Sequence, residues 1–92
     1  MDFHLKDPDG AVDYAIDWSL YLDGRTIAAS GWEIDPEESG GVAIIEAGFD
    51  GARTAVRLGG GEPGHVYRIA NHVAFSDGSS DDRSIALRVE QR

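Results

Sequence analysis

The chain of 92 residues carries 17 acidic and 8 basic side chains, a net charge of −9, and no cysteine. Its length fits one domain, and the missing cysteines exclude a disulfide framework, a thiolate metal site and a cysteine nucleophile. An acidic chain repels phosphate, so nucleic-acid binding is not expected, and no apolar run approaches the roughly 18–20 residues that a membrane helix needs.

The negative charge is concentrated in the first half of the chain. Residues 1–50 hold 12 acids and 2 bases, a net of −10, whereas residues 51–92 hold 5 acids and 6 bases, a net of +1. This imbalance has two interpretations. It either keeps the protein soluble or forms an acidic face that docks against a basic partner.

The first ten residues show no clear hydrophobic period. Asp7-Pro8-Asp9-Gly10 is typical of turns. Residues 1–10 are therefore interpreted as an N-terminal arm, which is either an ordered edge strand or free, and residues 11–92 as a single domain.

Alternation with period two begins after this arm and predicts strands rather than helices. In the first such segment, alternate apolar residues share one face: Tyr14, Ile16, Trp18 and Leu20. In the next, residues 26–34, Ile27 is out of phase with Trp32 and Ile34. A bulge near Ser30-Gly31 is the predicted correction.

The rest of the chain predicts four further strands, at residues 42–47, 52–58, 65–75 and 84–89. Charges, glycines and Pro36 make residues 35–41 a loop, Phe49-Asp50-Gly51 reads as a turn, and residues 76–82 form a polar loop. In the 65–75 strand the expected inward face consists of Tyr67, Ile69, Asn71, Val73 and Phe75.

These patterns predict an all-β protein, an immunoglobulin-like β-sandwich of about seven antiparallel strands with no significant helix. Tyr67, which follows the turn at Pro63-Gly64, fits a tyrosine corner whose hydroxyl bonds back to the upstream backbone. Trp18 and Trp32 are expected in the core. The better candidates for an interface among the aromatic residues are Phe3, Tyr21 and Phe49.

The residues that usually carry chemistry are not gathered in this sequence, and no catalytic residue or cofactor site is predicted. His65 and His72 fall on opposite faces of one strand, which argues against zinc. The loop at residues 77–82 offers three carboxylates and two hydroxyls, groups that calcium prefers. Its spacing is not that of an EF-hand, and a solvated hairpin loop is the preferred interpretation.

The order of several short motifs resembles a family of short structural proteins of tailed bacteriophages and prophages, of the neck, tail or fibre-tail adaptor type. The matching pieces begin with Lys6-Asp7-Pro8-Asp9 and Asp13-Tyr14-Ala15-Ile16-Asp17-Trp18. They continue with Thr26-Ile27, Trp32, Leu58-Gly59-Gly60, Tyr67, Asn71 and Asp81-Asp82-Arg83. The resemblance spans nearly the whole chain and implies an immunoglobulin-like sandwich.

The resemblance also implies a non-enzymatic virion protein that is made in the host cytoplasm, without a signal peptide, and joins neck, tail or fibre components. Its expected partners are other virion proteins, with a homo-oligomer on assembly as a further option. Contact candidates are Phe3, Lys6, Asp7, Asp9, Glu37, Glu38, Asp81, Asp82 and Arg83. Arg83 is expected to pair either with Asp81 or Asp82 or with a partner.

A second function stays open from the residues alone. It is a stand-alone immunoglobulin- or fibronectin-like module that binds carbohydrate or calcium, and an exposed tryptophan would favour it.

Overall fold

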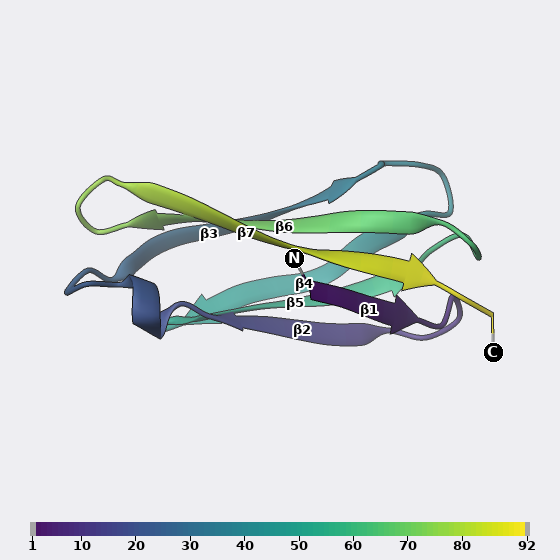
Figure 1. Ribbon diagram of the computed structural model, residues 1–92, viewed down its shortest axis with the longest axis horizontal. Helices are drawn as coiled ribbons and strands as arrows, with labels where there is room; N and C mark the ends of the chain where they lie inside the picture. The colour runs from purple at the N-terminus through teal and green to yellow at the C-terminus, as the bar shows by residue number, and fades with distance from the viewer. Residues whose placement is uncertain (1, 92) are drawn as a thin grey trace.

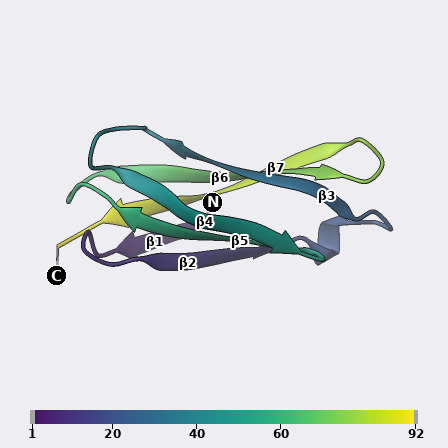
Figure 2. The same cartoon turned by 180° about the vertical axis from the view of Figure 1, so that it is seen from behind.

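The computed structural model describes residues 2–91, with side chains from His4 onward, as two β-sheets packed face to face (Figures 1 and 2). The seven strands in this range are β1 (Asp2–Lys6), β2 (Val12–Asp17), β3 (Ile27–Asp35), β4 (Val42–Asp50), β5 (Arg53–Gly60), β6 (Val66–Phe75) and β7 (Ser80–Val89). One sheet has the order β1-β7-β6-β3 and the other β2-β5-β4. The predicted all-β sandwich is confirmed.

The strand order is that of an immunoglobulin domain. The β2-β5-β4 sheet corresponds to strands B, E and D, and β3-β6-β7 corresponds to C, F and G. The first strand lies beside the last, β7, and pairs with it in parallel from Asp2↔Ile85 to Lys6↔Val89. The expectation of antiparallel strands was therefore wrong for this one pair. Of the two interpretations of the N-terminal segment, the ordered edge strand is the correct one for residues 2–6.

The core lies between the sheets and has two neighbouring hydrophobic clusters. The larger consists of Val42, Val56, Leu58, Tyr67, Ile69, Ile85, Leu87 and Val89. The smaller consists of Ile16, Trp18, Ile27, Val73 and Phe75. Burial of each large side chain contributes roughly 1.5–3 kcal/mol. The predicted inward face of β6 is confirmed, because all five of its residues are buried.

Two aromatic predictions can be compared directly with this core. Trp18 is fully buried, as expected, whereas Trp32 is only partly buried against both clusters. The tyrosine corner is confirmed, since the Tyr67 hydroxyl accepts a hydrogen bond from the Glu62 backbone N–H at 3.0 Å.

The position of one bulge and two strand boundaries differ from the prediction because of pairing between strands. The β3 bulge lies between Ile27 and Ala29, not at Ser30-Gly31, and it brings Ile27 into phase with the core. β4 continues to Asp50, because Phe49 still pairs with Thr54. β7 begins at Ser80 because a tight turn closes the β6–β7 hairpin, with the Phe75 N–H donating to the Ser79 carbonyl at 2.8 Å.

Candidate interaction surfaces

Lys6 lies inside the protein, where its ammonium group bonds to the backbone. The side chain is 1% exposed. Its Nζ donates to the carbonyl oxygens of Asp7 at 2.8 Å, Gly10 at 2.6 Å and Gly60 at 2.5 Å. Desolvation lowers the pKa of Lys6, and the nearby charges of Asp7 and Asp9 partly oppose that effect. In this conformation Lys6 is not available to a partner, so it leaves the set of contact candidates.

The turn after Lys6 carries two other candidates on the surface. The Asp7 carboxylate accepts the Asp9 backbone N–H at 2.9 Å, and the Gly10 N–H donates to the Asp7 carbonyl at 3.2 Å. Asp9 is exposed and Asp7 partly so. The side chain of Phe3 lies outside the described residues.

Glu38 anchors the loop between β3 and β4. Its Oε1 accepts the Tyr67 hydroxyl at 2.5 Å and lies 2.8 Å from His65 Nδ1. The hydrogen bond from Tyr67, followed by that from His65, holds the pKa of Glu38 below its usual value. Glu37 next to it is exposed. One acid of this loop therefore fixes its conformation, while the other is free to face a partner.

Asp82 lies within strand β7, not in a loop, and forms part of a bridge across the outer face of the larger sheet. His72 of β6 bonds through Nδ1 to Asp82 and through Nε2 to Glu33 of β3, the latter at 3.0 Å. The bond to Asp82, followed by that to Glu33, raises the pKa of His72. The two carboxylates bind opposite nitrogens of the ring, so they do not converge on a common point.

Arg83 lies over aromatic rings. Its guanidinium carbon is 5.4 Å from the centre of the Tyr21 ring and 5.8 Å from that of Trp18. Neither Asp81 nor Asp82 forms an ion pair with it among the described side chains. The expected local pairing was therefore wrong, and a cation–π contact takes its place.

The polar turn between β6 and β7 is organised by its own side chains. Asp77 accepts the Ser79 backbone N–H at 2.9 Å and also the Ser79 hydroxyl. These two bonds, the hydroxyl one first, lower the pKa of Asp77. Across residues 4–91, no group of three or more His, Cys, Asp or Glu side chains is placed to hold a metal ion.

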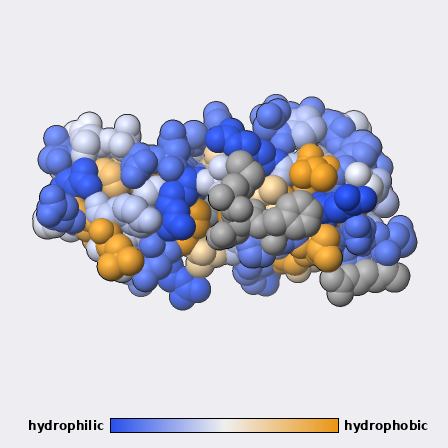
Figure 3. Space-filling view, viewed as in Figure 1, coloured by the Kyte–Doolittle hydropathy of each residue, from blue (hydrophilic) through white to orange (hydrophobic). Residues whose placement is uncertain are grey.

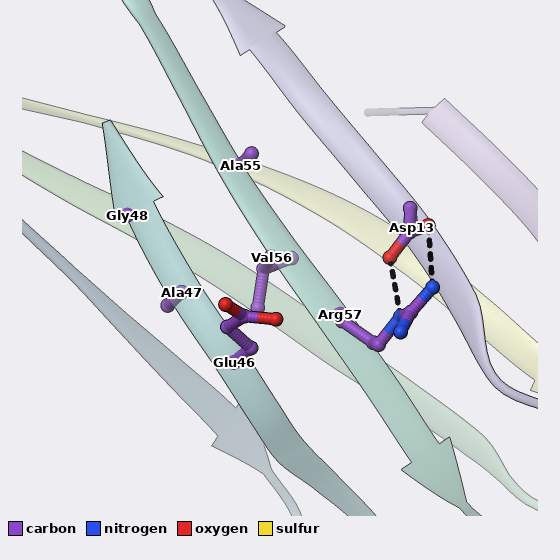
Figure 4. Close-up of a pocket in the computed structure, with 7 residues that line it drawn as sticks. All are labelled: Asp13, Glu46, Ala47, Gly48, Ala55, Val56 and Arg57. Carbon is purple, nitrogen blue, oxygen red and sulfur yellow. Dashed lines mark hydrogen bonds and ion pairs between the residues drawn. The ribbon is translucent and has the colours of Figure 1, made fainter. Parts of the chain in front are cut away.

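The outer face of the smaller sheet carries alternating charges across its strands. Arg57 of β5 lies opposite Asp13 of β2 and Glu46 of β4, and its Nε donates to Asp13 at 2.9 Å (Figure 4). Arg53 lies in the same way between Asp17 and Asp50. This exposed pattern is worth little in stability, but it gives β2 and β4 equivalent acidic residues at the two edges of one sheet.

Two of the groups of exposed apolar side chains lie toward opposite ends of the smaller sheet. The first is Leu20, 92% exposed, with Tyr21, 46% exposed. The second is at the start of β4, where Ile44 is 41% and Ile45 58% exposed. Phe49, 43% exposed, lies at the other end of β4, opposite Thr54, which pairs with Ile16 near the end of β2. Leu5 and Val66 are also exposed, and both pair with Arg88 in the larger sheet. Seen from one side in Figure 3, apolar side chains appear as isolated patches within a mostly hydrophilic surface.

The sequence predicted the exposure of only some of these residues. Tyr21 and Phe49 were named as interface candidates, and both are half exposed. Leu20 was expected on the same strand face as Trp18, but the chain leaves β2 at Asp17 and enters a 3₁₀ turn, η1 (Ser19–Tyr21), in which Leu20 is exposed. Ile44 and Ile45 were missed because an apolar pair within an apolar strand gives no sign of exposure.

None of the helical segments in residues 2–91 has the length and hydropathy that a membrane-spanning helix requires. No curated protein matches the chain at a significant level. A family model does match, over residues 6–88, and its description is podophage GP4 fiber-tail adaptor protein gp77. The match covers the sequence from Lys6 almost to the end of β7 and gives no support to a stand-alone carbohydrate- or calcium-binding module. The chain belongs to this family of podophage fibre-tail adaptors, structural components of the virion.

Proposed function

We propose that this protein joins a tail component to a fibre component by protein–protein contacts, and that it catalyses no reaction. The observation that carries this proposal is the presence of two separate exposed apolar surfaces, one at Leu20 and Tyr21 and the other at Ile44 and Ile45 near the start of β4. An adaptor must hold two different proteins at once. Exposed apolar patches with polar surroundings are typical of sites where proteins bind.

The polar contact candidates are distributed around these surfaces. Glu37 and Glu38 precede β4, and Arg83 contacts Tyr21. Asp7 and Asp9 lie in the β1–β2 turn, and Asp81 and Asp82 at the start of β7. Their proposed role is to set partner choice and orientation, because charges at the margin of an interface contribute more to specificity than to affinity.

The proposal extends to assembly. Several copies of the protein, made in the host cytoplasm, take their places around the tail axis, each in contact with other virion proteins. Contact with a partner that binds only the folded state adds to the stability of so small a domain.

Deletion of the gene from the phage that encodes this chain tests the proposed function. Particles purified after deletion are expected to contain tails without fibres, and supply of the protein in trans is expected to restore fibres. Electron microscopy and mass spectrometry of the particles provide the measurement. Particles that keep a full set of fibres without the protein would overturn the proposal.

A further inference from the structure

Strand β4 has an exposed edge without a partner strand in the described part of the chain. It pairs with β5 on one side and has no strand on the other (Figure 2). Every residue of β4 after Val42 is exposed. Edge strands with free backbone groups are templates for a further strand, and proteins usually blunt them with charge, brevity or cover. At nine residues with two acids, β4 is neither short nor covered.

The residues of β4 after its bulge present a regular alternation. Glu46, Gly48 and Asp50 lie opposite the exposed residues Arg57, Ala55 and Arg53 of β5. Ala47 and Phe49 lie opposite the buried residues Val56 and Thr54. Because cross-strand partners share a face of the sheet, Glu46 and Asp50 face outward, and Ala47 and Phe49 face the side of the core.

A shallow groove continues this edge toward β3. Its volume is about 280 Å³, and it is lined by Trp32, Glu33, Ile34, Glu37, Glu38, Val42, Ala43 and Ile44. Trp32, Ile34 and Val42 are buried or partly buried, while Glu33 and Glu37 are exposed. The groove therefore has an apolar floor with acidic side chains around it.

The chain segment that forms this edge and groove carries charge of one sign, although Arg57 and Arg53 of β5 lie opposite Glu46 and Asp50. Residues 26–52, from before β3 to after β4, contain six acids and no Lys, Arg or His. Glu33 and Glu38 bond to histidines of β6 and of the turn before it. Asp35, Glu37 and Asp50 form no ion pair among the described side chains.

We propose that β4 is the docking edge for an extended basic segment of another virion protein, which adds to the β2-β5-β4 sheet as a fourth strand. This inference rests on the proposed adaptor function and names the chemistry of one partner. The added strand pairs along Glu46–Asp50, and its continuation lies in the groove beside β3.

The alternation of β4 specifies the partner sequence. A residue of the added strand opposite Glu46 and one opposite Asp50 are four positions apart on the same face, so they are Lys or Arg at i and i+4. The residues at i+1 and i+3 face Ala47 and Phe49 and are apolar. Such β-strand addition gains affinity from main-chain hydrogen bonds and specificity from alternate side chains.

A second copy of this chain fits the same edge poorly. Two β4 strands side by side would bring Glu46, Asp50 and the acidic loop of one copy against the same acids of the other. Like charges directly opposite each other in a sheet are destabilising. The acidic edge therefore selects a basic partner and discourages self-association.

Photo-crosslinking in assembled particles tests the docking edge. Gly48 is replaced by p-benzoylphenylalanine, because a side chain at this position meets no atom within 4 Å and lies between Glu46 and Asp50. The matched control carries the same residue in place of Ala15, which lies in the same cross-strand row at the opposite edge of the sheet. Mass spectrometry identifies the cross-linked peptides.

The expected product from position 48, absent from position 15, is a peptide of another virion protein with the basic and apolar pattern described above. E46K/D50K is expected to reduce its yield at least tenfold. The matched variant D13K/D17K reverses two acids of β2 that lie opposite the same two arginines of β5. It is expected to change the yield of the cross-linked product less than twofold. Circular dichroism of both purified variants verifies that they fold.

Several outcomes would overturn the inference while leaving the adaptor function intact. The inference is wrong if fibres attach only when this protein is present but position 48 gives no cross-linked product. A product with a second copy of the chain or with a segment lacking the basic pair, or equal losses in the two charge-reversal variants, would also overturn it. Fibres attached in the absence of the protein would instead overturn the adaptor function, and this inference with it.

Discussion

The buried ammonium group of Lys6 binds three backbone carbonyls from two segments of the chain. Its partners belong to the turn after β1 and to Gly60 at the end of β5. Hydrogen bonds to a charged donor are worth more than neutral ones, and a buried carbonyl that loses its donor pays a desolvation cost. Lys6 therefore connects β1 of the larger sheet to Gly60, the last residue of β5 in the smaller sheet.

We predict that Lys6→Met lowers the free energy of unfolding by about 3 kcal/mol. Methionine fills a similar volume but donates no hydrogen bond, so the three carbonyls lose a donor. Urea denaturation followed by tryptophan fluorescence measures the change. Arg88→Met is the control, because Arg88 is exposed and its ion pair with Glu90 is a surface one, worth about 0–1 kcal/mol. Equal losses in the two variants would contradict this role for Lys6.

Glu38 gives the protein a predictable response to acid. The Tyr67 and His65 hydrogen bonds lower the pKa of Glu38 in the folded state below the ordinary value of 4.5. The unfolded state therefore takes up the proton first, and the stability that Glu38 provides is present above pH 4.5 and is lost as the pH falls through the lowered folded pKa.

The variant Glu38→Gln tests whether the stability provided by Glu38 is lost as the pH falls. The amide has no proton to gain, so the stability difference between the original protein and the variant is expected to be largest near pH 6 and to shrink below pH 4.5. Urea denaturation midpoints at several pH values give the measurement. A difference that stays constant from pH 6 to pH 3 would show that the Glu38 carboxylate is not coupled to folding.

Asn71 of β6 connects elements from both sheets through four hydrogen bonds. Its Oδ1 accepts Trp18 Nε1 at 3.0 Å and Thr54 Oγ1 at 2.7 Å. Its Nδ2 donates to Ser30 Oγ and to the Gly31 carbonyl, both at 2.9 Å. All the donors and acceptors of this amide are thus engaged, and the side chain fixes β3, β5 and the end of β2 relative to β6.

Asn71→Leu is expected to lower the free energy of unfolding by about 3–5 kcal/mol, because several buried polar groups lose their partner at once. Thr54→Val, which removes only the one hydroxyl bond from the network, is expected to cost about 1 kcal/mol. Thermal and urea denaturation provide both values. If Asn71→Leu cost no more than Thr54→Val, the network would not act as a joint between the sheets.

How far the sequence predicts this structure depends on the range of the interactions involved. The period-two pattern of residues 52–58 and 65–75 is local, and it predicted both strands, and the inward face of the second, correctly. The bulge in β3 was predicted to exist from the phase of Ile27, but its position depends on pairing with β6. The carbonyls around Lys6 and the rings beneath Arg83 come from distant segments, so no local pattern of charge or hydropathy could reveal them.

The candidate surfaces, too, could be predicted from the sequence only where they depend on neighbouring residues in the chain. The acidic loop at residues 35–41 was visible from composition. The exposure of Ile44 and Ile45 was not, because an apolar strand looks the same whether it lies at the centre or at the edge of a sheet. Only the strand order, with β4 outermost, makes these residues a surface.

At the scale of the whole molecule, the elongated shape separates the two apolar surfaces. The principal axes measure 43 × 21 × 20 Å. Leu20 follows the end of β2, where the Trp18 N–H bonds to the Ala52 carbonyl at the start of β5. Ile45 lies over Gly59, near the other end of β5, where a Cβ on that glycine would come within 2.7 Å of its Cδ1. Two partners can therefore bind without overlap.

Because the two surfaces are separate, a single substitution in one surface is expected to weaken binding to only one of the two partners. Leu20→Ser is expected to weaken binding to one of the two virion components at least tenfold and to change binding to the other less than twofold, and Ile45→Ser is expected to do the reverse. Loss of an interface anchor costs about 2 kcal/mol or more, whereas exposed substitutions of this kind alter folding stability by only about 0.5 kcal/mol. Each purified variant is titrated against the isolated tail complex and the isolated fibre. Loss of the same component in both variants would mean that the protein holds a single partner, because its two apolar surfaces would then form one interface.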